Sequence, residues 1–110
     1  MNIVIWGDSW GQPNWAKPQS GFTAEGHTAN RLRRLGYEVE NLSENGHGNI
    51  TSIQRQSHIK PDWVIWFHTE LTRDFPIFKK ELKGTTWTYL DMCNSTAEFI
   101  YSLASDKLVS

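Results

Sequence analysis

Three short apolar runs along the chain predict β-strands, at residues 2–7, 37–42 and 63–67. The first and the third are apolar at nearly every position and rich in β-branched or aromatic side chains, which is typical of strands buried on both faces. The second run alternates apolar and polar positions, so one face of that strand is expected to be wetter.

Helical patterns occupy the segments between and after these strands. The first helix is expected to end before Gly36, at the position where a glycine commonly caps a helix. The last is placed by Ser95 and Glu98, which have the spacing of a capping box. The four expected helices are residues 23–35, 50–59, 75–83 and 95–107.

Strands and helices therefore alternate with short connections, and this order predicts a parallel sheet with right-handed crossovers. Residues 85–90 (TTWTYL) have strand propensity and are a candidate fourth strand. No repeat, low-complexity segment or linker interrupts the sequence, so residues 1–110 are expected to form a single domain. The predicted fold is α/β with three layers, flavodoxin-like, with a sheet of order 2-1-3.

Composition and charge narrow the class of protein. A chain of 110 residues has the size of one small domain, and 38% apolar against 21% charged residues is typical of a globular chain. Eleven basic and twelve acidic residues give a net charge of −1, which leaves no electrostatic footprint for nucleic acid. No apolar run approaches the ~20 residues that span a bilayer, and Met1 is not followed by the charged region of a secretory signal. The lone Cys93 cannot form an internal disulfide, which suits a reducing cytoplasm. Together these features predict a cytoplasmic protein without nucleic-acid or membrane partners.

Six tryptophans are unusual in so short a chain. They are too many for a small core to hide completely, so some are expected to line a surface or a groove. Trp10 and Trp15 follow the first strand, where their rings could stack on a sugar, cover an acyl chain or equally cap the core.

Polar loops follow all three predicted strands abruptly, at residues 7–10, 45–49 and 68–70. In an open parallel sheet, ligands bind outside the carboxyl ends of the strands, so these loops are the expected site. Ser9 follows the first strand within a Gly-Asp-Ser turn, which would expose its hydroxyl as a nucleophile beside backbone N–H groups. Asp8 is expected to orient this turn by bonding nearby amides. The plainer alternative is that Gly-Asp-Ser only forms a tight turn and has no catalytic role.

In order and spacing, three segments resemble the SGNH/GDSL hydrolase superfamily over residues 2 to about 71. They are the strand and turn IVIWGDS, the loop NLSENGHGN and the lead-in PDWVIWF. The resemblance implies an SGNH-hydrolase-like fold and a serine ester hydrolase in which Ser9 attacks an ester carbonyl. It also implies that the backbone N–H of Ser9 and that of Gly46, or alternatively Gly48, contribute to an oxyanion hole.

Two features depart from the pattern of that superfamily. Where it has Gly-x-Asn-Asp after the third strand, this chain has HTEL, and an ionised Glu70 cannot donate a hydrogen bond to an oxyanion. The Asp-x-x-His that supplies the base and its orienter is absent. Either the base comes from outside these 110 residues, from a missing C-terminal half or the other part of a divided enzyme, or it is rebuilt. In the rebuilt form His68 is the base and Glu70 or Asp8 is its orienter.

Residue types that bind divalent metals also occur in these loops. They are Asp8, His47, His68 and Glu70. No two of them have a recognised ligand spacing, so neither a metal nor another cofactor is expected. His47 is instead a candidate substrate-binding residue, together with Trp10 and Trp15.

Two functions from different classes follow from these patterns. The first is the serine ester hydrolase, acting on a small ester or an acylated sugar, and the intact Gly-Asp-Ser loop favours it. The second is a non-catalytic binding or structural protein on the same scaffold, favoured by Glu70 and by the absent Asp-x-x-His. A homodimer is a further candidate, because a three-stranded sheet leaves an edge and apolar surface to cover.

Overall fold

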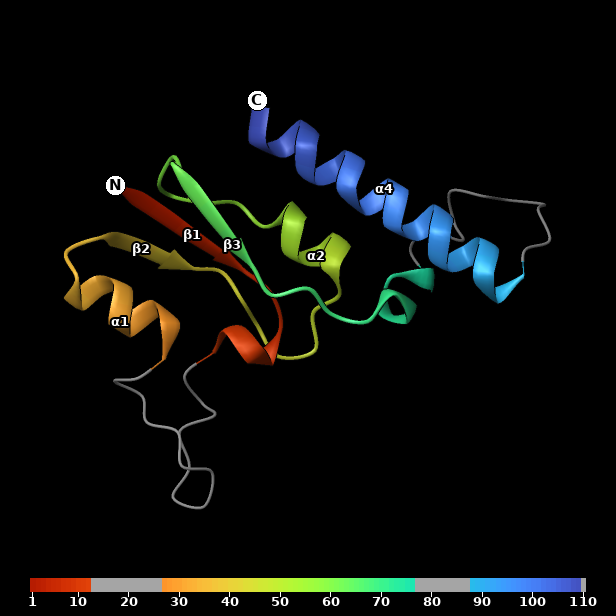
Figure 1. The fold of residues 1–110 in the computed structure, drawn as a ribbon, viewed down its shortest axis with the longest axis horizontal. Helices are drawn as coiled ribbons and strands as arrows, with labels where there is room; N and C mark the ends of the chain where they lie inside the picture. The colour runs from red at the N-terminus through yellow and green to blue at the C-terminus, as the bar shows by residue number, and fades with distance from the viewer. Residues whose placement is uncertain (13–26, 77–87, 110) are drawn as a thin grey trace, which may run out of the picture.

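Three parallel strands form the sheet at the centre of the computed structural model, which describes residues 1–12, 27–76 and 88–109 (Figure 1). The strands are β1 (Asn2–Trp6), β2 (Glu38–Asn41) and β3 (Trp63–Trp66), in the order β2-β1-β3. This confirms the predicted α/β fold with a parallel sheet of order 2-1-3.

The central strand β1 is the most deeply buried element. Its register places Val4 between Glu40 of β2 and Val64 of β3. Residues 3–6 are all buried, as expected for an apolar strand with neighbours on both sides and both faces. β2 is half-buried throughout beyond its exposed first residue, so the alternation of its sequence does not give one buried and one wet face.

Helices cover the two faces of the sheet. α1 (Thr28–Arg34) connects β1 to β2 and packs against β2, whereas α2 (Asn49–Gln54) steps back from β2 to β3. Because these steps run in opposite directions, right-handed crossovers place the two helices on opposite faces. The long helix α4 (Tyr89–Val109) lies beside α2 (Figure 1). The main core lies between the sheet and the helices α2 and α4. Its buried members are Val4, Trp6, Leu42, Ile50, Ile53, Ile100 and Ala104.

α4 begins six residues earlier than the sequence pattern predicts. A different capping box starts it: the amide of Thr88 donates to Oδ2 of Asp91 (3.3 Å), and the amide of Asp91 donates to Oγ1 of Thr88 (3.1 Å). Ser95 and Glu98 therefore lie within the helix. The expected fourth strand is wrong for its last two residues, which belong to α4, and residues 85–87 lie outside the described residues.

α2 is shorter than predicted, because the chain turns to an extended conformation at Arg55. The carboxylate of Glu40 then accepts the amides of His58 and Ile59 and the hydroxyl of Ser57, and these bonds replace further helix. Among the other expected helices, residues 23–26 and most of 75–83 lie outside the described residues. Within the described part of the chain, no helix combines the length and the apolar content needed to cross a bilayer.

Removing the observed cap of α4 tests this helix start. Thr88→Ala is expected to lower the free energy of unfolding by about 1 kcal/mol, the usual cost of losing a side-chain N-cap. Urea unfolding followed by circular dichroism measures it. Thr72→Ala is the matched control, because Thr72 is exposed and caps no helix. Equal stabilities of the two variants would show that the box formed by Thr88 and Asp91 does not hold the helix start.

Candidate functional site

The chain leaves β1 through a turn that only glycine fits. Gly7 has a φ of +151°, and a Cβ at this position would lie 2.7 Å from Cβ of Phe67, just beyond β3. The turn continues as η1 (Ser9–Gly11), a single 3₁₀ turn. The tight passage past Phe67 therefore sets where Asp8 and Ser9 leave the sheet.

Asp8 holds this turn with both carboxylate oxygens. Its residue is 3% exposed, and Oδ1 accepts the amide N–H of Trp10 (3.1 Å). Oδ2 accepts a hydrogen bond from Nη1 of Arg73 (3.2 Å), a residue that the sequence patterns did not single out. Asp8 thus orients the backbone around Ser9, and its buried carboxylate forms an ion pair with the partly exposed Arg73.

The end of β2 and the segment that follows it, residues 42–48 (loop two), lie directly against η1. Nδ2 of Asn41 donates to the carbonyl of Gly11 (2.6 Å), and the Gln12 side chain donates to the carbonyl of Ser43. A Cβ on Gly11 would come within 2.5 Å of Oγ of Ser43, so this glycine permits the close approach. The serine turn and loop two are therefore held together as one continuous surface.

Loop two is joined to loop three, residues 67–70 after β3, by Asn49 and by Asp74, which is fully buried. Its carboxylate accepts the amides of Asn49 (3.2 Å) and Ile50 (2.9 Å) and the Asn49 side chain (3.0 Å). The Asn49 side chain also bonds both backbone groups of Thr69. A Cβ on Gly48 would lie 2.6 Å from Oδ1 of Asp74, so Gly48 is buried against this carboxylate. Gly46, the other expected oxyanion donor, is exposed in a turn with φ +79°.

His68 lies in a ladder of aromatic rings that runs from the sheet to α4. Its ring centroid is 4.0 Å from that of Trp66, which in turn makes an edge contact with Trp6 at 5.5 Å. Nδ1 of His68 is 3.3 Å from Oη of Tyr101. Although His68 is exposed at the surface, partial desolvation by the neighbouring rings lowers its pKa below the ordinary value. The structure thus brings Tyr101 to this ring nitrogen, and no hydrogen bond within the described residues joins His68 to Glu70.

Two of the expected substrate-binding residues are described, and they lie in different segments: His47 after β2 and Trp10 on η1. Nε2 of His47 pairs with Glu44 (3.1 Å), which also pairs with Arg55 (3.2 Å). Trp10 is 60% exposed on η1, and Trp15 lies outside the described residues. An open hollow of about 450 Å³ lies next to η1, and its polar lining is Gln12, Asn41, Ser43, Glu44, Asn45 and Arg55.

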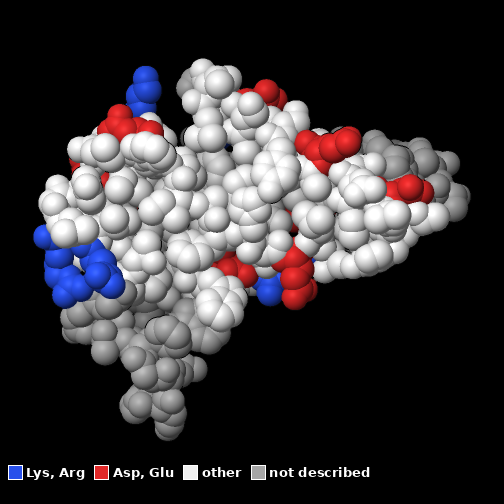
Figure 2. All heavy atoms as spheres, viewed as in Figure 1, with Lys and Arg blue, Asp and Glu red and all other residues white. Residues whose placement is uncertain are grey.

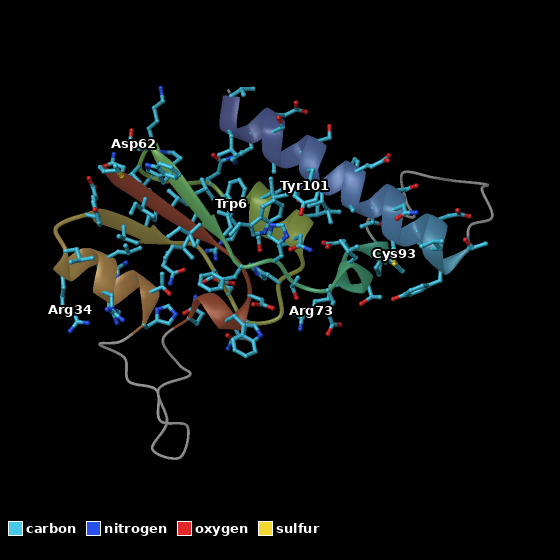
Figure 3. The ribbon with its side chains drawn as sticks, viewed as in Figure 1. Trp6, Arg34, Asp62, Arg73, Cys93 and Tyr101 are labelled. Atoms are coloured by element: carbon cyan, nitrogen blue, oxygen red, sulfur yellow. The ribbon has the colours of Figure 1, made fainter. Side chains whose placement is uncertain are left out.

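Acidic and basic side chains are paired near these loops, whereas α1 carries a patch of basic side chains. Figure 3 shows Arg73 at the lower edge of the molecule, well away from Arg34 on α1. The blue group at the left of Figure 2 lies over α1, whose last turn carries Arg31, Arg33 and Arg34. One of them, Arg33, donates to Asn30 and to the carbonyl of Val39, so this basic face also supports local structure.

Comparisons of the chain with known protein families and with curated proteins found no match. In the described ranges, no three His, Cys, Asp or Glu side chains are grouped so that they could hold a metal ion. The residues that join the loops, Arg73, Asp74 and Asn49, were missed because each acts on a partner far away in the sequence. The only local signal was an Arg-Asp pair shortly after the third polar loop.

Proposed function

We propose that this chain is a serine ester hydrolase of the SGNH/GDSL type with Ser9 as its nucleophile. The supporting observation is the turn after the central strand, in which Gly7 fits against Phe67 and buried Asp8 fixes the amide of Trp10. A serine held in this way has a defined approach to a substrate and N–H groups beside it, which nucleophilic catalysis requires.

The reaction proceeds through an acyl-enzyme. Oγ of Ser9 forms a bond to the ester carbonyl carbon while its hydroxyl proton passes to a general base. The ester C–O bond then breaks, and the departing alcohol takes up that proton. Water hydrolyses the acyl group and restores the hydroxyl. Gly46 is the preferred partner of the Ser9 amide in the oxyanion hole, because Gly48 is buried against Asp74.

His68 is the candidate base within the described residues. When Nδ1–H donates to Oη of Tyr101, Nε2 carries the lone pair that can accept a proton. The lowered pKa of His68 keeps the ring neutral at neutral pH. Tyr101 then takes the orienting role that the sequence assigned to Glu70 or Asp8.

Two measurements test His68 as the base. The acid limb of kcat/KM is expected to have its midpoint below the ordinary histidine pKa of 6.5, because partial desolvation lowers the pKa and protonation removes the base. His68→Ala is expected to lower kcat/KM by about 100-fold or more. His58→Ala is the matched control, because the His58 side chain is almost fully exposed on another loop. Unchanged hydrolysis by His68→Ala would exclude His68, and a rate that rises with protein concentration would indicate a base from a second chain.

The substrate is proposed to be a small ester or an acylated sugar. The hollow beside η1 supports this choice, because its lining of amide, hydroxyl and charged groups suits a ligand rich in hydroxyls. Gln12 links the hollow to the nucleophile, since its backbone N–H donates to the carbonyl of Ser9 (3.0 Å). Trp10, exposed on the same turn, offers a flat apolar surface for the rest of the ligand.

The alternative is a binding protein without catalysis, and the same polar hollow is the observation that favours it. A fluorophosphonate probe separates the two functions. In a hydrolase, Oγ of Ser9 displaces fluoride from phosphorus and the hydroxyl proton passes to the base, which leaves a stable phosphonyl adduct. Mass spectrometry of the digested protein is expected to find this adduct on Ser9. A wild-type protein that stays unlabelled would favour the binding protein.

A further inference from the structure

Arg73 is a cation in direct contact with the turn that carries Ser9. It is the last residue of η3 (Leu71–Arg73), and Nη1 of its guanidinium is 3.2 Å from Oδ2 of Asp8. The Asp8 side chain is 3% exposed, whereas that of Arg73 is 40% exposed. One edge of the guanidinium is therefore fixed against a buried carboxylate, and another part faces solvent at the level of the loops (Figure 3).

The backbone that carries Arg73 is held firmly. Its amide donates to the carbonyl of Glu70 (3.2 Å), and the next residue, Asp74, is fully buried under the start of α2. Cβ of Arg73 also lies 3.5 Å from the position that a Cβ on Gly48 would take. The turn after β1, loop two and loop three thus all contribute to the position of this guanidinium, which is the kind of support that a preorganised charge needs.

A guanidinium has five N–H donors in a rigid fork. The contact with Asp8 uses one of its nitrogens, and the exposed part of the group can donate to a ligand oxygen. Negative charge develops on the carbonyl oxygen of the ester when Ser9 attacks the carbonyl carbon. Hydrogen-bond donors that are fixed in advance stabilise this charge most. Glu70, in the same loop, carries a negative charge and cannot donate.

We propose that Arg73 is the electrophilic residue of this site, donating to the oxygen that becomes negative as Ser9 reacts. This role rests on the proposed hydrolase function. The competing role is purely structural: Arg73 would only neutralise Asp8 and so keep the turn in place. The two roles differ in what happens once Asp8 no longer carries a charge.

Rates of fluorophosphonate labelling in single and double variants test the proposal. Arg73→Gln is expected to label about 100-fold more slowly than wild type, the usual loss for one oxyanion donor. Arg73→Lys is expected to recover part of that rate, since it restores the charge but not the fork. Asp8→Asn keeps an acceptor for the Trp10 amide and removes the charge. The double variant Asp8→Asn/Arg73→Gln is expected to be at least about ten-fold slower than Asp8→Asn alone.

Arg33→Gln is the matched control, because Arg33 is likewise an exposed arginine that donates to a side-chain oxygen but lies on α1. It should label at the wild-type rate, and melting curves should show that all variants are folded. With an ester substrate, loss of Arg73 should lower kcat more than it raises KM, because the charge appears only in the transition state. Equal rates for Asp8→Asn and the double variant would overturn the electrophilic role and leave the hydrolase intact. Wild-type protein that never labels would overturn both.

Discussion

Ser9→Ala is expected to abolish labelling by the fluorophosphonate and to lower ester hydrolysis about a thousand-fold or more. Without Oγ no covalent bond to the carbonyl carbon or to phosphorus can form, so only binding and the oxyanion donors remain. The measurement combines intact-protein mass spectrometry after labelling with initial rates on a chromogenic acetate ester.

The turn itself is expected to survive this substitution. The backbone bonds of η1 run from Gly11 to the carbonyl of Asp8 (3.1 Å) and from Gln12 to the carbonyl of Ser9 (3.0 Å). The carboxylate of Asp8 bonds Trp10 and Arg73, so none of these contacts uses the Ser9 hydroxyl. A loss of labelling with an unchanged melting temperature therefore reports chemistry and not unfolding.

Ser102→Ala is the matched control, because Ser102 is exposed on α4 and far from β1 in the sequence. It should label as fast as wild type. If Ser9→Ala labels at the wild-type rate, the nucleophile is another residue and the proposed function loses its main support. Peptide mapping of the adduct then identifies that residue directly.

The strands could be predicted because their signal is local. Residues 2–7 and 63–67 are apolar at nearly every position, and such runs have few alternatives to a strand in a short chain. Only the first is buried as predicted, because β3 is half-buried and Trp63 at its start is 62% exposed. The start of α4 was harder, since two pairs of residues have the spacing of a capping box. The pair Thr88 and Asp91 is used and the pair Ser95 and Glu98 is not, because the buried stripe of the helix already begins at Met92.

The contacts that build the candidate site have no local signal. Asp8 and Arg73 are 65 positions apart, and Asn49 and Asp74 are 25 positions apart. Their pairing depends on strands that bring distant loops to one edge of the sheet, which a pattern along the chain does not encode. The sequence could therefore indicate the three loops, but the charged residues that hold them together came only from the structure.

Asp74→Ala is expected to destabilise the protein more than any surface change, by about 3 kcal/mol or more, since charge-assisted bonds are worth about 1.5–3 kcal/mol each. Three N–H donors, from the backbone and side chain of Asn49 and the backbone of Ile50, would lose a fully buried acceptor. Folded domains of this size are stable by only about 5–15 kcal/mol, so the loss would be a large share of the total. Urea unfolding followed by tryptophan fluorescence measures it.

Asp106→Ala serves as the control for Asp74→Ala, because Asp106 is exposed on α4, and its stability should equal that of wild type. Asp74→Asn should fall between the two, because an amide keeps one acceptor but turns a donor toward other donors. Labelling of the folded Asp74→Ala protein should also slow, because loops two and three would separate and Arg73 would lose its fixed backbone. A stability of Asp74→Ala within about 1 kcal/mol of wild type would mean that water replaces the carboxylate, and that Asp74 does not hold the loops together.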